Sequence, residues 1–215
     1  MSVAPKAMHD ALREPWHSLH RQREGVSLGV WVFLGSEVMF FGGAFLLYAM
    51  YRVLYPAAFA EASHEASMMY GSINTALLLT SSLTMTVATE GARAGLRRLA
   101  LICLLVTVFL GLAFLVVKGL EYREDIHKNL IPGPHFGMDN PAAQLFWAFY
   151  WLLTGVHAVH LSGGILFASL MTFEAWRGTR PLVSPGFEAL GLYWSFVDLV
   201  WIFLYAVIYL PGRSL

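Results

Sequence analysis

Residues 99 to 117 read LALICLLVTVFLGLAFLVV, a run without a single charged residue. A helix needs about 20 such residues to cross a bilayer core about 30 Å thick. Lipid offers backbone groups no hydrogen-bond partner outside the helix itself. The run therefore predicts a transmembrane helix. With four further runs of this kind, the predicted spans are about 28–51, 72–90, 98–118, 144–172 and 187–210.

Composition supports the same fold class. Of 215 residues, 57% are hydrophobic and only 13% are charged, which is typical of an integral membrane protein rather than a soluble domain. No period of 20 to 50 residues repeats along the chain. We therefore expect one all-α membrane domain over 28–210, a five-helix bundle, preceded by a polar cytoplasmic segment 1–27 and followed by a short tail 211–215. Polar connections are predicted at 52–71 and 119–143, the second being a longer irregular loop.

Several classes of protein are disfavoured by charge and cysteine usage. Lys plus Arg and Asp plus Glu number 14 each, so no basic surplus suggests a nucleic-acid partner. The lone Cys103 excludes an intrachain disulfide and a zinc site built on cysteine pairs. The first 26 residues have no apolar core, so we expect no cleavable signal peptide.

The distribution of Lys and Arg predicts the orientation. If the N-terminus is cytoplasmic, that side receives nine of these residues and the other side five, which favours N-inside and C-outside. The nine are Lys6, Arg13, Arg21, Arg23, Arg93, Arg97, Arg98, Arg177 and Arg180. The five are Arg52, Lys118, Arg123, Lys128 and Arg213.

Four titratable side chains lie inside the predicted spans. At 1.5 Å per residue, Glu37 lies about 14 Å from the start of the first span and Asp198 about 16 Å from the start of the fifth. His157 and His160 are near the centre of the fourth span, three residues apart and so on one side of its helix. Charges at such depth are costly and usually pair with one another or face a protein partner. We expect all four groups in one layer.

Different functions are compatible with these groups. A haem would need axial histidines on facing helices, which a pair at i, i+3 does not supply. Two imidazoles with Glu37 or Asp198 could bind a transition metal. A transporter would need broken helices, for which Gly42-Gly43 and Gly163-Gly164 are candidates, although small residues also let helices pack closely. Glu37 and Asp198 could equally be carboxyls that lock helices together or groups that handle protons.

Five strings, in chain order, resemble one family. They are SEVMFFGG (36–43), NTALLLTSS (74–82), KGLEY (118–122), TGVHAVH (154–160) and YWSFVDLVWIFLY (193–205). Together with the span count, they are similar to subunit III of the haem-copper terminal oxidases, the cytochrome c and quinol oxidases. The chain resembles the five-helix version of that subunit, and the resemblance also implies N-inside and C-outside.

The resemblance implies a non-catalytic role in oxygen reduction and proton translocation. In the family, haem and copper belong to partner subunits, and subunit III packs against subunit I. It binds phospholipid and supports proton uptake and the lifetime of the enzyme. We therefore expect no catalytic residue, metal or redox cofactor on this chain. We do expect bound phospholipid and a multi-pass location in the bacterial inner membrane.

Matching motifs identify the candidate site residues. Glu37 corresponds to the family's buried glutamate in SEV, His157 and His160 to its TG-x-H-x-x-H pair, and Asp198 to the acid of its YWHFVD motif. Asn74, which opens the NTALLLTSS string, joins these as a buried polar candidate.

Further candidates lie at the ends of spans. Lys118, Glu121 and Tyr122 match the family's KG-x-EY string, and we expect the lysine to snorkel towards the headgroups with the neighbouring acid paired to it. Candidate partners of lipid phosphates are Arg97, Arg98, Arg177 and Arg180. Aromatic residues expected as interfacial belts are Trp31, Trp147, Trp151, Trp176 and Tyr209.

One departure from the family concerns Ser195, which stands where histidine is common. A helical serine can return its hydroxyl to its own backbone, so we expect Asp198 to depend on His157 or His160 instead. Shorter relatives that accompany nitric oxide reductases share the TG-x-H-x-x-H and EY features and are the alternative family. The intact SEVMFFGG and FVDLVWIFLY strings favour an oxidase.

Overall fold

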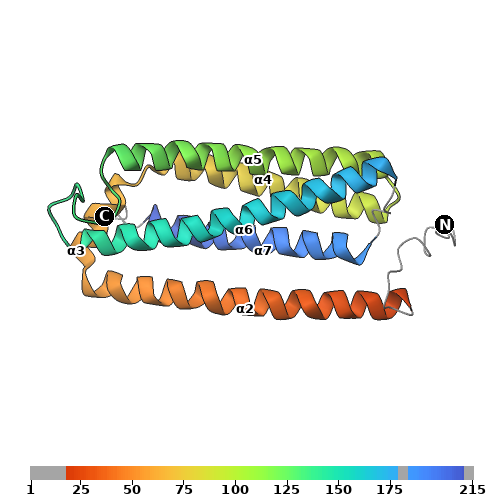
Figure 1. Cartoon of the computed structure of the whole chain (residues 1–215), viewed down its shortest axis with the longest axis horizontal. Coiled ribbons are helices and arrows are strands. Elements are labelled where there is room, and N and C mark those ends of the chain that lie inside the picture. Colours follow the sequence, from red (N-terminus) through yellow and green to blue (C-terminus); the bar gives the residue numbers. More distant parts are fainter. Residues whose placement is uncertain (1–17, 179–183, 211–215) are drawn as a thin grey trace.

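The computed structural model describes residues 18–178 and 184–210, all of whose regular structure is helical (Figure 1). The predicted all-α fold class is therefore confirmed. The helices are α2 (Leu19–Leu54), α3 (Pro56–Glu65), α4 (Met68–Arg93), α5 (Arg97–His127), α6 (Ala143–Arg177) and α7 (Pro185–Ile208).

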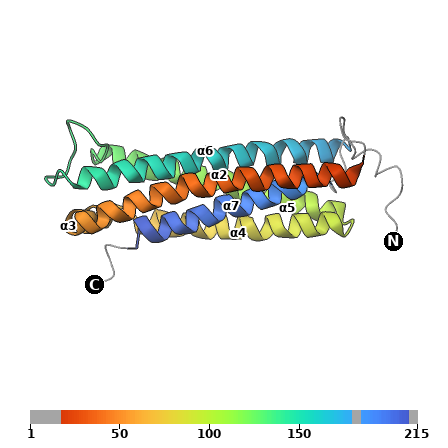
Figure 2. The same ribbon diagram turned by 90° about the horizontal axis from the view of Figure 1, so that it is seen from below.

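Four of the long helices form a closed ring. Helix α4 packs on α5, α5 on α6, α6 on α7, and α7 returns to α4. Helix α2 lies outside the ring and packs against α6 and α7 (Figures 1 and 2). The short α3 contacts α2 and α6 at the end of the bundle where α2 finishes. The interior of the ring is therefore the place where polar side chains are most deeply enclosed.

Helix ends follow local chemistry. The Ser18 hydroxyl accepts a hydrogen bond from the Arg21 amide and caps α2, which begins nine residues before the predicted span. Helix α2 ends just before Pro56, which opens α3 at the position where proline is best tolerated. Gly178 ends α6 in the left-handed conformation, at φ +75°, which glycine adopts without a steric penalty.

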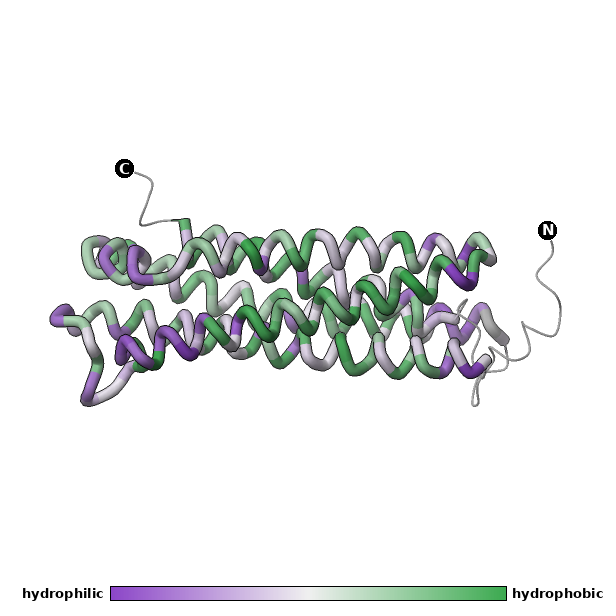
Figure 3. Tube along the Cα trace, turned by 90° about the horizontal axis from the view of Figure 1, so that it is seen from above, coloured by the Kyte–Doolittle hydropathy of each residue, from purple (hydrophilic) through white to green (hydrophobic). Residues whose placement is uncertain are grey.

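Within the described residues, four helices are long and apolar enough to cross a membrane: His20–Leu54 of α2, then α5, α6 and α7. Apolar residues occupy their middles and polar ones gather towards the ends of the bundle (Figure 3). Helix α4 is 26 residues long but carries eight serine and threonine side chains, which make it more polar. Most of these hydroxyls donate to carbonyls of α4 itself, as in Thr75 to Gly71 at 2.8 Å. They are thus satisfied without leaving the helix.

The structure adds detail to one predicted connection and corrects the other. The connection at 52–71 contains α3, because Pro56 starts a second helix immediately after α2. The irregular loop predicted from 119 begins only after His127, because α5 continues for two more turns. Those turns hold Glu121 and Asp125, which are buried against neighbouring helices rather than exposed in a loop.

One face of α2 attaches it to the ring. Phe41 and Phe45 pack on the aromatic rings of Phe196 and Phe203 of α7. Tyr48, at 1% exposure, donates its hydroxyl to the Val207 carbonyl at 2.9 Å. Residues three or four apart lie on one side of a helix, so Glu37, one turn before Phe41, is directed at the same neighbours.

Candidate functional site

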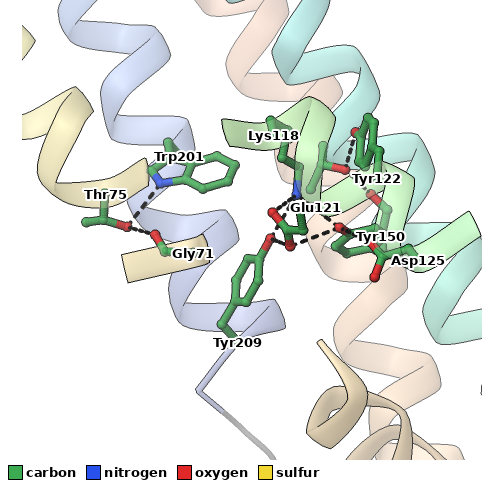
Figure 4. Close-up of polar contacts among 10 residues, drawn as sticks. Gly71, Thr75, Lys118, Glu121, Tyr122, Asp125, Tyr150, Trp201 and Tyr209 are labelled. Carbon is green, nitrogen blue, oxygen red and sulfur yellow. Dashed lines mark hydrogen bonds and ion pairs between the residues drawn. The ribbon is translucent and has the colours of Figure 1, made fainter. Parts of the chain in front are cut away.

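Lys118 lies inside the ring and not at a lipid surface. Its side chain is 2% exposed and that of Glu121 is 1% exposed, so the expected snorkelling of Lys118 was wrong. The reason is that hydrogen-bonding groups inside the protein take the place of the headgroups. The ammonium lies 3.0 Å from Glu121 Oε2 and donates to the hydroxyls of Tyr150 at 3.1 Å and Tyr209 at 2.8 Å (Figure 4). Three helices, α5, α6 and α7, therefore meet at one cation.

Aromatic rings enclose the same ammonium. Its nitrogen lies 4.5 Å from the ring centre of Tyr150, 5.0 Å from Tyr122 and 5.6 Å from Trp201. Aromatic faces attract cations, more strongly where water is excluded. A buried ion pair is costly unless further hydrogen bonds and nearby charge compensate the lost hydration. Here the hydroxyls and rings supply that compensation.

Asp125 extends this cluster by one turn along α5. The Tyr150 hydroxyl lies 3.0 Å from Glu121 Oε1 and 2.7 Å from Asp125 Oδ2, while the Tyr209 hydroxyl donates to Glu121 Oε1 at 2.6 Å (Figure 4). Asp125 is 3% exposed. We call these five residues the Lys118 cluster: Lys118, Glu121, Asp125, Tyr150 and Tyr209.

Hydroxyl bridges connect the motifs around the Lys118 cluster. The Tyr122 hydroxyl, from KGLEY, is 2.7 Å from the Thr154 hydroxyl that opens TGVHAVH. Trp201 Nε1 donates to Thr75 on α4 at 3.1 Å, and Trp194 Nε1 donates to Ser81 at the same distance. Strings far apart in the sequence are thus bonded to one another across the ring.

Glu37 and His160 form a second polar site, between α2 and α6. Glu37 Oε2 lies 3.1 Å from His160 Nε2, and the two side chains are 16% and 20% exposed. His160 Nδ1 lies 2.9 Å from the carbonyl of Val156. A carbonyl only accepts, so Nδ1 carries the hydrogen of that bond, and Nε2 is the ring nitrogen that faces the Glu37 carboxyl. The pair therefore joins α2 to α6 by an acid–imidazole contact close to the bundle surface.

His157 does not join that pair, although it is one turn away. It is 1% exposed, and its ring packs on Phe114 of α5 and Trp201 of α7 at 5.7 and 5.2 Å. Neither ring nitrogen has a hydrogen-bond partner among the residues that the structure describes. The two histidines thus face different helices, and His157 lies within the ring beside the Lys118 cluster.

Asp198 is buried elsewhere on α7. Its carboxyl lies beside the hydroxyl of Ser82 on α4, but neither oxygen has a hydrogen bond of good geometry in the described ranges. The expectation that Asp198 depends on His157 or His160 was wrong, because those rings are directed at Trp201 and Glu37. Ser195 returns its hydroxyl to Gly191 of its own helix at 3.0 Å, as expected.

The remaining candidates are distributed over the bundle. Asn74 is fully buried, and its amide has no hydrogen-bond partner in the described part of the chain. Arg97 donates to the Ala175 carbonyl at the end of α6, Arg177 lies 4.2 Å from the Phe173 ring, and Arg98 is exposed. Arg180 lies outside the described residues.

Some expected belt aromatics are interior. Trp31 and Trp176 are 61% and 71% exposed, which suits a lipid interface. Trp147 and Tyr209 are instead buried, at 0% and 1% exposure, so their assignment to a belt was wrong. Both are buried near the end of the ring where α6 begins and α7 ends, and Tyr209 bonds Lys118 and Glu121 there. Trp151 is half-buried and donates to the Leu130 carbonyl at 3.1 Å.

Metal-ligating side chains do not converge within 18–178 and 184–210: no group of three or more His, Cys, Asp or Glu is placed to hold an ion there. The possible site of two imidazoles and a carboxylate is absent from these ranges because only one imidazole meets Glu37. The geometry provides an acid–imidazole contact and hydrogen bonds that link the helices.

Long apolar helices around a hydrogen-bonded polar interior define a multi-pass helical membrane protein. Over residues 6–213 the chain matches the family described as Cytochrome c oxidase subunit III. It is 33% identical to the Cytochrome c oxidase subunit 3 of Bacillus subtilis, over 86% of each chain. The Cytochrome bo(3) ubiquinol oxidase subunit 3 of Pseudomonas aeruginosa is 32% identical, with 86% of this chain and 84% of the relative covered. The Probable cytochrome c oxidase subunit 3 of Mycobacterium tuberculosis is 32% identical over 97% and 98%.

The chain belongs to the cytochrome c oxidase subunit III family. It is therefore subunit III of a haem-copper terminal oxidase, a multi-pass membrane protein of a bacterial respiratory enzyme whose partners are the other oxidase subunits. The resemblance drawn from the five motifs is confirmed. Its relatives include subunits of both cytochrome c and quinol oxidases.

Proposed function

We propose that this chain is a non-catalytic subunit that supports oxygen reduction and proton pumping by neighbouring subunits, which carry the haem and copper. The observation that carries this proposal is how its buried polar groups are used. The Lys118 cluster links α5, α6 and α7, and tryptophans bond α7 to α4. These hydrogen bonds hold the helices together, and this use of the buried polar groups supports a structural rather than a catalytic role in the oxidase.

The proposed topology has five spans with the N-terminus in the cytoplasm. The α4–α5 turn and the end of α6 lie at the same end of the bundle as the start of α2 (Figure 1). That end carries the larger group of basic residues, which favours the cytoplasmic side. The hydroxyl-rich α4 is the second of the five proposed spans in chain order. Residues 1–27 are the proposed polar cytoplasmic segment, 28–210 the membrane domain, and 211–215 the tail.

We further propose that α2, α4 and α5 supply most of the contact with subunit I. Because α2 lies outside the ring, it exposes large apolar side chains along its length, including Leu28, Val32, Met39, Leu46 and Val53. Such a surface suits a protein partner or lipid within the membrane. Arg97, Arg98 and Arg177 at the basic end are the proposed partners of phospholipid headgroups.

Purification tests the supporting role. A tagged chain isolated from solubilised membranes should bring down haem-containing oxidase subunits, whereas the chain expressed alone should show no Soret band. His157→Ala should leave the haem content of the complex unchanged, because this histidine packs on Phe114 and Trp201. A Soret band from the isolated chain that disappears in His157→Ala would contradict the proposal.

Glu37 is the proposed link to proton uptake by the neighbouring subunit. Glu37→Gln leaves a polar side chain of the same size beside His160 Nε2, and its amide can donate there, but it removes the exchangeable proton. Residues that act on a site without touching its reactants change it by about 0.5–2 kcal/mol, roughly 2- to 30-fold. We expect a change of that size in turnover against pH, or in the number of turnovers before inactivation. Ser36→Ala is the control, since among the described residues the Ser36 hydroxyl bonds its own helix, at the Phe33 carbonyl. Identical profiles for wild type and Glu37→Gln would eliminate this role.

A further inference from the structure

The Lys118 cluster contains two buried carboxyls but only one cation. Glu121 and Asp125 lie one helical turn apart on α5, at 1% and 3% exposure. With both ionised, the cluster has a net negative charge in an enclosed, largely aromatic environment. Lys128, whose charge also reaches Asp125, lies 3.0 Å from Glu124 at the exposed end of the helix and serves that carboxylate. Burial of an uncompensated charge is strongly unfavourable.

The hydrogen bonds of the Lys118 cluster also lack one hydrogen. Six close contacts connect its polar atoms: three from the Lys118 ammonium, one from the Tyr209 hydroxyl, and two from the Tyr150 hydroxyl. The ammonium supplies three hydrogens and each tyrosine supplies one. The single hydrogen of Tyr150 faces two carboxyl oxygens, at 3.0 and 2.7 Å. One contact therefore lacks a hydrogen.

We propose that the cluster binds one additional proton, held on the carboxyl of Asp125 and donated to the hydroxyl oxygen of Tyr150. Tyr150 then directs its own hydrogen to Glu121 and accepts from Asp125 and Lys118, which uses its full hydrogen-bonding capacity. Every contact has a hydrogen, and the cluster becomes electrically neutral. One proton thus neutralises the excess negative charge and supplies the missing hydrogen.

The two carboxyls differ in a way that assigns the proton to Asp125. Glu121 receives the Lys118 ammonium on Oε2 and the hydroxyls of Tyr150 and Tyr209 on Oε1, and such donors favour the ionised form. Within the described ranges the Asp125 carboxyl has one side-chain hydrogen bond, from Tyr150. The other titratable groups around it are Tyr122 on α5, whose hydroxyl bonds Thr154, and the exposed Glu124 and Lys128. None of them supplies a second donor to the Asp125 carboxyl.

Infrared spectroscopy of the whole purified oxidase at neutral pH tests the proton directly. Comparison of wild type with Asp125→Asn should show the loss of one carbonyl band of a protonated carboxylic acid, a band that shifts in D₂O. Glu124→Gln is the matched control, because Glu124 is an exposed carboxylate on the same turn. It should remove carboxylate bands only. Loss of carboxylate bands in Asp125→Asn would overturn the proposal.

Retention of the subunit provides a second, independent measurement. Asn at position 125 reproduces the neutrality and the donated hydrogen of a protonated acid, so this variant should copurify with the oxidase like wild type. Glu121→Gln should be retained less, because it leaves the Lys118 ammonium without its carboxylate. If Asp125→Asn is lost from the complex while Glu121→Gln is retained, the proton is not on Asp125 and the proposal is wrong.

Discussion

Lys118→Met should greatly reduce the amount of this subunit in the purified oxidase. The substitution keeps an unbranched side chain of similar length but leaves the Glu121 carboxylate buried without its cation. Removing one partner of a buried pair costs about 3–5 kcal/mol, a large part of the roughly 5–15 kcal/mol that stabilises a typical folded protein. The hydroxyls of Tyr150 and Tyr209 also lose a donor. The measurement is the ratio of this chain to its partner subunits after detergent purification, at several temperatures.

Lys128→Met is the matched control for this prediction. Lys128 pairs with Glu124 at the same 3.0 Å distance, but both side chains are about two-fifths exposed. Exposed pairs contribute about 0–1 kcal/mol, so the subunit should be retained. The double variant Lys118→Met with Glu121→Gln removes the unpaired charge and should recover part of the loss. Normal retention of Lys118→Met at all temperatures would show that the buried ion pair contributes little.

Long apolar runs made the membrane helices predictable from the sequence, but shorter or more polar helical segments were not. The helix over 98–118 was evident because lipid and ring interior both require apolar side chains. The turns 119–127 were not, since their polar residues are satisfied by partners on other helices. The same limitation hid α3, a short helix whose existence depends on Pro56 and on packing against α2 and α6.

Depth within the membrane predicted one contact between site residues. Counting residues along each span placed Glu37 and His160 at similar depth, and they meet at 3.1 Å. Depth does not say which helices are neighbours, so Tyr150 and Tyr209 gave no signal as partners of Lys118. Asp125 did have one, because it follows Lys118 and Glu121 at helical spacing on the same side of α5. Predicting the burial of Lys118 would have required knowing that α4, α5, α6 and α7 form a closed ring.

The largest packing effect is expected at Trp201, where the Lys118 cluster meets α4 and α6. Its side chain is fully buried. The ring packs edge-on against Phe114 at 4.7 Å and on His157 at 5.2 Å, and its Nε1 donates to Thr75. It also lies 5.6 Å from the Lys118 ammonium. A change here therefore affects four of the five long helices at once.

Trp201→Ala should destabilise the subunit by about 3–5 kcal/mol, the usual cost of truncating a buried large aromatic side chain. The cavity would adjoin His157, whose ring nitrogens already have no hydrogen-bond partner among the described residues. Trp176→Ala removes an equally large side chain that is 71% exposed, and should change stability by no more than about 0.5 kcal/mol. Thermal release of the subunit from the intact oxidase distinguishes the two. Trp201→Phe refines the result, because it retains most of the ring volume but not the donor to Thr75. We expect its release temperature to lie between those of Trp201→Ala and wild type. Equal release temperatures for Trp201→Ala and Trp176→Ala would refute the role of Trp201 in joining the helices of the ring.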